Sequence, residues 1–286
     1  MKVGFIGAGK VGFALGKYFA LSSVDVTGYY SRSPLSAREA ADFTQTRHYG
    51  SIEQVLAASD LLFLAVPDSA ISQVWDALKT MPVQDKIICH CSGALSSKVF
   101  DGIESRRAHG YSLHPFLAVS SKHNSHNDIA RAFFTLEGSE TRLQEVKRFI
   151  ENLGNRVCVI EAAQKTKYHA AAVFLSNHVV ALADIGGNLL RECGFDEELV
   201  SAALGTLLLV NSKKIAESGA VKALTGPVER NDLSTIQKHV ACLDAKERQL
   251  YIALSARLIK IAKEKHGDYD YLAMETFIKS EMECKE

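Results

Sequence analysis

The sequence lacks an excess of charge of either sign, because 33 lysine and arginine residues balance 33 aspartate and glutamate residues. Without a basic excess, no nucleic-acid partner is expected. No apolar run looks long enough to span a bilayer, and the first apolar run begins at residue 2, so we expect neither a membrane partner nor a signal peptide. These absences, with an ordinary hydrophobic content of 47%, predict a cytoplasmic globular protein.

The sequence also lacks a metal-binding arrangement of cysteines. Cys89 and Cys91 are too close together for the usual zinc spacing and lie in a predicted strand. The remaining cysteines are scattered, at Cys158, Cys193, Cys242 and Cys284. We therefore expect reduced, mostly buried thiols and no metal.

The strongest positive signal is a glycine-rich turn between a strand and a helix. An apolar run at residues 2–6 precedes Gly7-Ala8-Gly9-Lys10-Val11-Gly12, and a helical pattern follows over residues 13–19. Strand, G-x-G-x-x-G and helix in this order predict a dinucleotide-binding unit. The first glycine permits a tight turn, the second lets the backbone approach a pyrophosphate, and the third lets helix and strand pack closely. A glycine-rich turn without a ligand is the alternative.

The end of the second predicted strand has no carboxylate. A NAD-binding unit usually places one there, to accept hydrogen bonds from the ribose hydroxyls. This chain has Tyr30, Ser31, Arg32 and Ser33 at these positions. Arg32 can bind a 2′-phosphate through its planar guanidinium group, and the two serines can donate hydrogen bonds to it. The sequence therefore predicts NADP(H) rather than NAD(H), unless Arg32 is only a solvated charge in the loop.

Strand and helix patterns alternate over the first half of the chain and predict an α/β Rossmann domain, a doubly wound and mostly parallel sheet. Ligands bind such sheets at the carboxyl ends of the strands. Ala65-Val66-Pro67 and Ser92-Gly93 follow two predicted strands, so we assign them to the cofactor site. We expect this domain to occupy residues 1–161.

Long helical periods replace the strand patterns from residue 162, which predicts an all-α domain over residues 162–286. Asp196, Asp232 and Asp244 are predicted N-caps. We expect helices at about 163–193, 196–218, 232–243 and 244–265. The first of these is apolar around much of its circumference, which predicts burial within a bundle or across a subunit interface.

Candidate catalytic residues lie in two segments. His114 follows a predicted strand. On a helical wheel Lys165, His169 and Ser176 fall within about 40° of one another, and Asn177 lies at the edge of this stripe. Histidine can donate a proton near neutral pH, and serine or asparagine can orient a substrate oxygen or nitrogen. The structural alternatives are a histidine in a proline-bounded turn, and a helix start with solvated polar residues.

Arg230 is a candidate ligand for a substrate carboxylate, because it lies in a connector that otherwise needs no arginine. Its structural alternative is a pair with an acidic side chain. The sequence thus predicts a small-molecule substrate, and Arg230 would bind a carboxylate on that substrate if it carries one.

Several of these motifs together resemble one bacterial family, which pairs a Rossmann-like domain with a helical domain of unknown function. They are the glycine-rich opening, Ala65-Val66-Pro67-Asp68, Ser92-Gly93, Leu113-His114-Pro115-Phe116, the segment from His169 to Asn177, and the segment from Leu224 to Asp232. More distantly the chain is similar to pyrroline-5-carboxylate reductase, 6-phosphogluconate and 3-hydroxyisobutyrate dehydrogenases, and ketopantoate reductase.

The resemblance implies NADP binding, a 6-phosphogluconate dehydrogenase C-terminal-like helical domain that forms a homodimer, and an active site between the two domains. It supplies no substrate. The hydroxyacid dehydrogenases carry a lysine four residues before an asparagine, and here Val173 stands four residues before Asn177. This difference argues against lysine-based alcohol oxidation and leaves His169 or Lys165 as the candidate acid.

The sequence thus leads to an NADP(H)-dependent oxidoreductase that acts on a small carbonyl, hydroxy-acid or imine substrate by hydride transfer. Ser176 and Asn177 would orient the reacting group. The alternatives are a non-catalytic NADP-binding sensor or scaffold, and hydride exchange with a deazaflavin.

Overall fold

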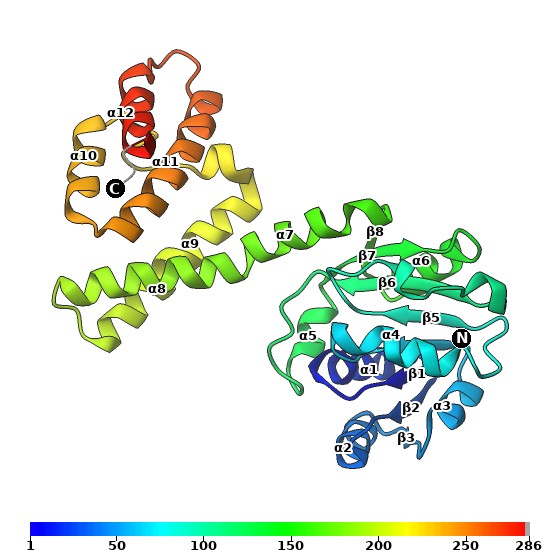
Figure 1. The fold of residues 1–286 in the computed structure, drawn as a ribbon. Helices are drawn as coiled ribbons and strands as arrows, with labels where there is room; N and C mark the ends of the chain where they lie inside the picture. Colours follow the sequence, from blue (N-terminus) through cyan, green and yellow to red (C-terminus); the bar gives the residue numbers. More distant parts are fainter. Residues whose placement is uncertain (284–286) are drawn as a thin grey trace. The chain divides into compact units, whose positions relative to one another are not determined.

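The computed structural model describes residues 1–283, so Cys284 lies outside the described part (Figure 1). The chain divides into two compact units, Met1–Asn177 and a second that begins at His178. This division comes later in the chain than the expected one at residue 161, because the helix after that residue is anchored on the sheet by the buried side chain of Lys165.

The first unit alternates strands and helices. The sequence does not predict its shortest helical elements, because they are too short to show a helical period of hydrophobic residues. These are α5 (Ser125–Ile129) and the 3-10 turns η1 (Ser97–Val99), η2 (Glu104–Arg106) and η3 (Ala162–Gln164). The strands are β1 (Val3–Ile6), β2 (Val26–Tyr30), β3 (Arg47–His48), β4 (Leu61–Leu64), β5 (Ile87–His90), β6 (His109–Pro115), β7 (Phe133–Gly138) and β8 (Arg156–Val159). The other helices are α1 (Lys10–Leu21), α2 (Pro34–Thr44), α3 (Ile52–Ala58), α4 (Asp68–Leu78), α6 (Leu143–Glu151) and α7 (Lys165–Leu175).

The strands form one eight-stranded sheet in the order β3-β2-β1-β4-β5-β6-β7-β8 (Figure 1). Neighbouring strands are parallel throughout, except that β6 and β7 are antiparallel. This confirms the predicted Rossmann class. Since β1, β4, β5 and β6 run side by side and parallel, the loops that follow them emerge along one edge of the sheet.

A hydrophobic core covers each face of this sheet, as alternation along buried strands requires. On one face Phe5 and Phe63 stack with ring centroids 5.4 Å apart. On the other face Ile6 and Leu62 pack in the same core as Trp75 of α4. The sheet is therefore held from both sides, and its carboxyl edge is a rigid platform for a site.

The second unit is helical, with α8 (Asn177–Glu192) leading into it and α9 (Glu197–Ala223), α10 (Leu233–Cys242), α11 (Ala245–Lys265) and α12 (Leu272–Glu283) following. The predicted N-caps are confirmed, because the carboxylates of Asp196, Asp232 and Asp244 accept hydrogen bonds from first-turn amides. The sequence does not predict α12.

Two predicted helix boundaries need comment. The helix expected at 163–193 is interrupted at Ser176, whose backbone leaves the helical region at φ −126° and ψ −75°. The helix expected to end at Ser218 continues to Ala223, but Gly219 breaks its geometry with φ +78°. Glycine adopts this left-handed region without the steric cost that a Cβ imposes.

Helices α8 and α9 expose much of their apolar surface. Leu207 and Leu209 are each 72% exposed and Val180 is 70% exposed. By length and composition alone, segments 162–192 and 197–223 meet the criterion for a membrane span. This finding corrects the expectation that no apolar run is long enough to span a bilayer. The exposed side chains also form a large apolar surface on the second unit, which no other described part of the chain covers.

Candidate functional site

The turn between β1 and α1 has the geometry that the glycine pattern predicts. Gly7 has φ +103°, a left-handed conformation that favours glycine. A Cβ on Gly12 would lie 2.7 Å from the carbonyl oxygen of Gly7, so a side chain there would force helix and turn apart. Within the described residues no side chain caps α1 at Gly9, and its first turn carries no acidic residue. The first amides of α1 can therefore bind an anion.

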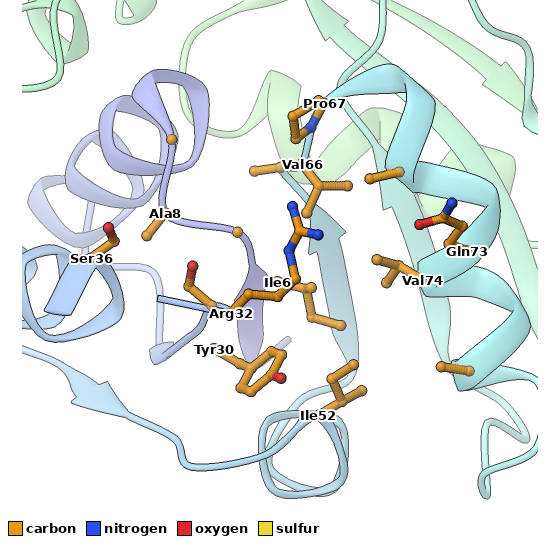
Figure 2. Close-up of a pocket in the computed structure, with 16 residues that line it drawn as sticks. Ile6, Ala8, Tyr30, Arg32, Ser36, Ile52, Val66, Pro67, Gln73 and Val74 are labelled. Atoms are coloured by element: carbon orange, nitrogen blue, oxygen red, sulfur yellow. The ribbon is translucent and has the colours of Figure 1, made fainter. Parts of the chain in front are cut away.

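A cavity of about 480 Å³ lies against this turn, which is within the size range of ligand pockets. Figure 2 shows the side chain of Arg32 extending across it, between the turn that carries Ala8 and the helix that carries Gln73 and Val74. Apolar residues form much of its wall, among them Tyr30, Ile52 and Val66. The lining residues include no Asp or Glu among the described part of the chain. These features fit an adenine nucleotide with an anionic group.

Most predicted cofactor residues line this cavity, namely Gly7, Ala8, Gly9, Ser31, Arg32, Ala65, Val66 and Pro67. The cavity lining does not include Lys10, Val11, Gly12, Ser33, Ser92 and Gly93. Ser33 instead caps α2, because its hydroxyl accepts from the backbone N–H of Ser36, 3.3 Å away. Ser36 also lines the cavity, although the sequence does not predict it as a cofactor residue. It lies in the first turn of α2, and its local sequence does not differ from that of an ordinary helix.

Ser92 builds the loop after β5 and uses its polar atoms within the protein. Its hydroxyl donates to the carboxylate of Asp68 at 2.7 Å and accepts from the amide of Leu95 at 2.9 Å. His90 supports the same loop: its Nδ1 accepts from the amide of Ser92 at 3.2 Å, and its Nε2 lies 3.2 Å from the carbonyl oxygen of Ser96. Burial lowers the pKa of His90 to about 4, so this histidine is neutral and structural.

Lys165 joins the start of α7 to two strand ends. Its Nζ donates to the carbonyl oxygen of Ser92 at 2.9 Å and to the hydroxyl of Ser112 at 2.8 Å. The residue is 2% exposed, and this burial lowers its pKa to about 8, although the charges of Glu137 and Asp68 oppose the shift. Two of its three donors are therefore already used in positioning α7 and the Ser92 loop.

His114 and His169 approach each other at Gly93. The Nδ1 atom of His114 lies 2.7 Å from the hydroxyl of Tyr168. A Cβ on Gly93 would lie 2.7 Å from Nδ1 of His169 and 3.0 Å from Nε2 of His114, so glycine allows both rings to pack against the loop. Nδ1 of His169 is buried and has no hydrogen-bond partner among residues 1–283.

His114, His169, Lys165 and the Ser92 loop therefore form one polar cluster within the first unit, and we call these residues with Gly93, Ser112 and Tyr168 the edge cluster. Burial, together with the electrostatic effects of Lys165, His169 and His90, lowers the pKa of His114 to about 3. His114 is thus a neutral imidazole at physiological pH, able to donate or accept but not to act as a cation.

The structure does not include the other predicted catalytic residues, Ser176, Asn177 and Arg230, in the edge cluster. The hydroxyl of Ser176 donates to the carbonyl oxygen of Ala172 at 2.7 Å and lies 3.0 Å from Oδ1 of Asn177, so its proton is engaged in its own helix. Arg230 is exposed and belongs to the second unit. The roles of Ser176, Asn177 and Arg230 stay predictions. No group of three or more metal-ligating side chains occurs in residues 1–283.

Comparisons with known proteins agree with this two-part organisation. Residues 1–115 match the Rossmann-like domain, and residues 132–258 match a domain of unknown function, DUF2520. The chain thus combines these two domains, which confirms the resemblance derived from the motifs. No curated protein matches the chain at a significant level.

Solved structures share the fold along nearly the whole chain. A protein of Thermotoga maritima is 26% identical, with a TM-score of 0.74 and coverage of 92% of this chain and 99% of that one. A Bacteroides fragilis protein, described as a proposed NADP oxidoreductase, is 25% identical, with a TM-score of 0.70 and coverage of 91% and 98%. A pyrroline carboxylate reductase of Plasmodium falciparum with NADP bound is 15% identical, with a TM-score of 0.63 and coverage of 96% and 98%. Imine reductases share the fold as well.

Proposed function

We propose that this protein is an NADP(H)-dependent oxidoreductase. The observation that carries the proposal is the cavity at the β1–α1 turn, which joins free helix amides to Arg32 at the end of β2. The amides would hold the pyrophosphate, and the guanidinium group of Arg32 would bind the 2′-phosphate. A NAD-binding site would instead present a carboxylate to the ribose hydroxyls. The solved structures of NADP proteins with this fold support the same cofactor.

The chemistry proposed is reduction of a small carbonyl or imine compound, or the reverse oxidation of a hydroxy acid or amine. NADPH, when bound, supplies the hydride to the substrate carbon. The oxygen or nitrogen of the substrate takes a proton, which His169 would donate. The contacts favour His169 over Lys165 for this role, because Lys165 is committed to Ser92 and Ser112 while Nδ1 of His169 has no partner among the described residues.

A homodimer formed through the helical unit is part of the proposal. The exposed leucines and valines of α8 and α9 form an apolar surface of a kind that soluble monomers rarely expose, and a second copy of the chain would cover it. The alternative is that a membrane covers this surface. A protein that stays in solution as a dimer without detergent would favour the second copy, and one that requires detergent would favour the membrane.

The experiment that tests the cofactor is a fluorescence titration of the purified protein with NADPH, with NADH in parallel. A preference for NADPH of about tenfold or more, equal to about 1.4 kcal/mol, is expected. NADPH oxidation is then measured with a panel of ketoacids, cyclic imines and lactones. Binding of neither nucleotide would overturn the proposal. Binding without oxidation of any compound would favour a non-catalytic sensor, and hydride exchange with a deazaflavin would redirect the substrate assignment.

A further inference from the structure

The edge cluster contains an arrangement that the hydride-transfer proposal does not yet use. The position that a Cβ on Gly93 would occupy lies 2.7 Å from Nδ1 of His169 and 3.0 Å from Nε2 of His114, so the two nitrogens are near each other across this glycine. Two nitrogens so placed are close enough for a single oxygen or nitrogen atom to reach both at hydrogen-bond distance. Nδ1 of His169 is also buried without a partner in the described residues, and such an atom calls for a ligand or a water.

The partner of His114 on its other side determines what its Nε2 can do. Tyr168 lies on α7 with its hydroxyl 2.7 Å from Nδ1 of His114, and the two rings meet edge to face with centroids 5.7 Å apart. Burial raises the pKa of Tyr168, so its hydroxyl keeps its proton and can donate it to Nδ1. A neutral imidazole that accepts at Nδ1 carries its hydrogen on Nε2.

We propose that His114 and His169 together bind one uncharged carbonyl oxygen of the substrate, whose two lone pairs can accept from both, with Nε2 of His114 as hydrogen-bond donor and Tyr168 fixing this tautomer. This inference rests on the proposed function and deepens it by naming the group that the edge cluster recognises. A neutral histidine donor polarises a carbonyl without itself needing to lose a proton. The titratable groups that face His114 are Lys165 and His169 on α7 and His90 on β5, and positive charge on any of them disfavours protonation of His114.

The tautomer can be tested without any substrate or cofactor. The full chain is labelled with ¹⁵N-histidine, and long-range ¹H–¹⁵N spectra are recorded between pH 5 and 8, with His114 assigned by its loss in His114→Gln. We expect the Nε2–H tautomer throughout this range. Tyr168→Phe should convert His114 to a mixture of tautomers, which loss of simple packing would not do. A Nδ1–H tautomer or an imidazolium in the wild-type protein would overturn the inference.

Ligand recognition is tested with 2-pyrrolidinone, an uncharged lactam, added in large molar excess to the protein saturated with NADP⁺. The resonances of His114 and His169 should shift together. His114→Gln, whose amide can replace Nε2–H, should keep the lactam affinity within about threefold, whereas His114→Leu should lose about tenfold, as expected for one neutral hydrogen bond. Equal loss in both variants, or shifts of neither histidine, would overturn the inference and leave the cofactor proposal intact.

Gly93→Ala provides a third variant, because its Cβ would displace both imidazoles. It should abolish the paired shifts. Gly50→Ala is the matched control, since a Cβ there meets nothing closer than the flexible end of Gln54 at 3.6 Å. If NADP⁺ fails to bind the wild-type chain, the cofactor proposal fails, while a Nδ1–H tautomer of His114 in the ligand-free protein would overturn this inference independently of cofactor binding.

Discussion

The carboxyl edge of the sheet and the helices α8 and α9 contrast in how they treat polar and apolar groups. At the sheet edge, charged and polar side chains are buried, including Lys165 at 2% exposure. On α8 and α9, large apolar side chains are exposed, including Leu207 at 72%. Burying a cation costs free energy unless it is paired, and exposing leucines forgoes the hydrophobic effect. Each region therefore carries a cost that folding of one chain does not explain.

The two costs point to two kinds of partner. Buried polar groups that keep an unpaired nitrogen, as at His169, are typical of a site that binds a small polar ligand. Exposed apolar helices are typical of a surface that binds a macromolecular partner. The first unit thus buries its apolar surface by itself and has polar groups available for a ligand, whereas the second unit needs a partner to bury the apolar side chains of α8 and α9.

The largest effect is expected when charged residues replace apolar ones on the exposed surface of α9, because the association of the chain should then be lost. If the proposed homodimer forms, the double variant Leu207→Glu with Val210→Glu should convert it to a monomer, because two desolvated carboxylates would face the second copy of the chain. Light scattering coupled to size-exclusion chromatography measures the mass. Leu35→Glu on α2, where the leucine is 77% exposed, is the control and should leave the mass unchanged. A monomeric wild-type protein, or one that requires detergent, would contradict the dimer.

Removing the unpaired imidazole sharpens the case for a ligand at the sheet edge. His169→Ala should lower turnover by about 10²-fold or more, the usual contribution of a general acid, with nucleotide affinity retained. Steady-state kinetics with a compound from the oxidation panel give the value. His48→Ala, at an exposed position on β3, should have little effect. An unchanged rate in His169→Ala would remove this residue from the mechanism.

Lys165→Met tests the cost of the buried cation through its pH dependence. Burial lowers the pKa of Lys165 from 10.5 to about 8, so between these values the unfolded chain holds a proton that the folded chain has released. The free energy of unfolding of the wild type should therefore rise relative to the variant as pH increases from 8 to 10.5, by about 2 kcal/mol.

Urea unfolding curves at several pH values measure this difference, and groups common to both proteins cancel in it. Lys167→Met on the exposed side of α7 is the control and should show no such trend. A pH-independent difference between wild type and Lys165→Met would mean that Lys165 keeps an ordinary pKa.

The smallest expected effect concerns the cofactor cavity. Arg32→Gln should weaken NADPH binding by about tenfold, or about 1.4 kcal/mol, and leave NADH binding unchanged, because only the 2′-phosphate requires the guanidinium group. Parallel fluorescence titrations measure both affinities. Arg38→Gln, an exposed arginine on α2, is the control. Equal weakening for both nucleotides would show that Arg32 contributes only packing.

Much of the fold follows from local sequence patterns. The glycine spacing predicted the β1–α1 turn, because only glycine tolerates φ +103° at Gly7 and the close contact at Gly12. Aspartates before helical periods predicted the N-caps, since a side-chain carboxylate is the natural partner of free first-turn amides. Elements such as α5 were not predictable, because five residues do not complete a recognisable period.

The candidate site divides in the same way. The sequence by itself determined that a dinucleotide unit opens the chain and that Arg32 replaces the usual carboxylate, since both features lie within one strand–turn–helix–strand segment. Only the tertiary structure decided that His114 meets Tyr168, that Lys165 is buried on Ser92 and Ser112, and that Gly93 lies between two imidazoles. These partners are far apart along the chain, and their meeting depends on where β5, β6 and α7 end in space, which local patterns do not encode.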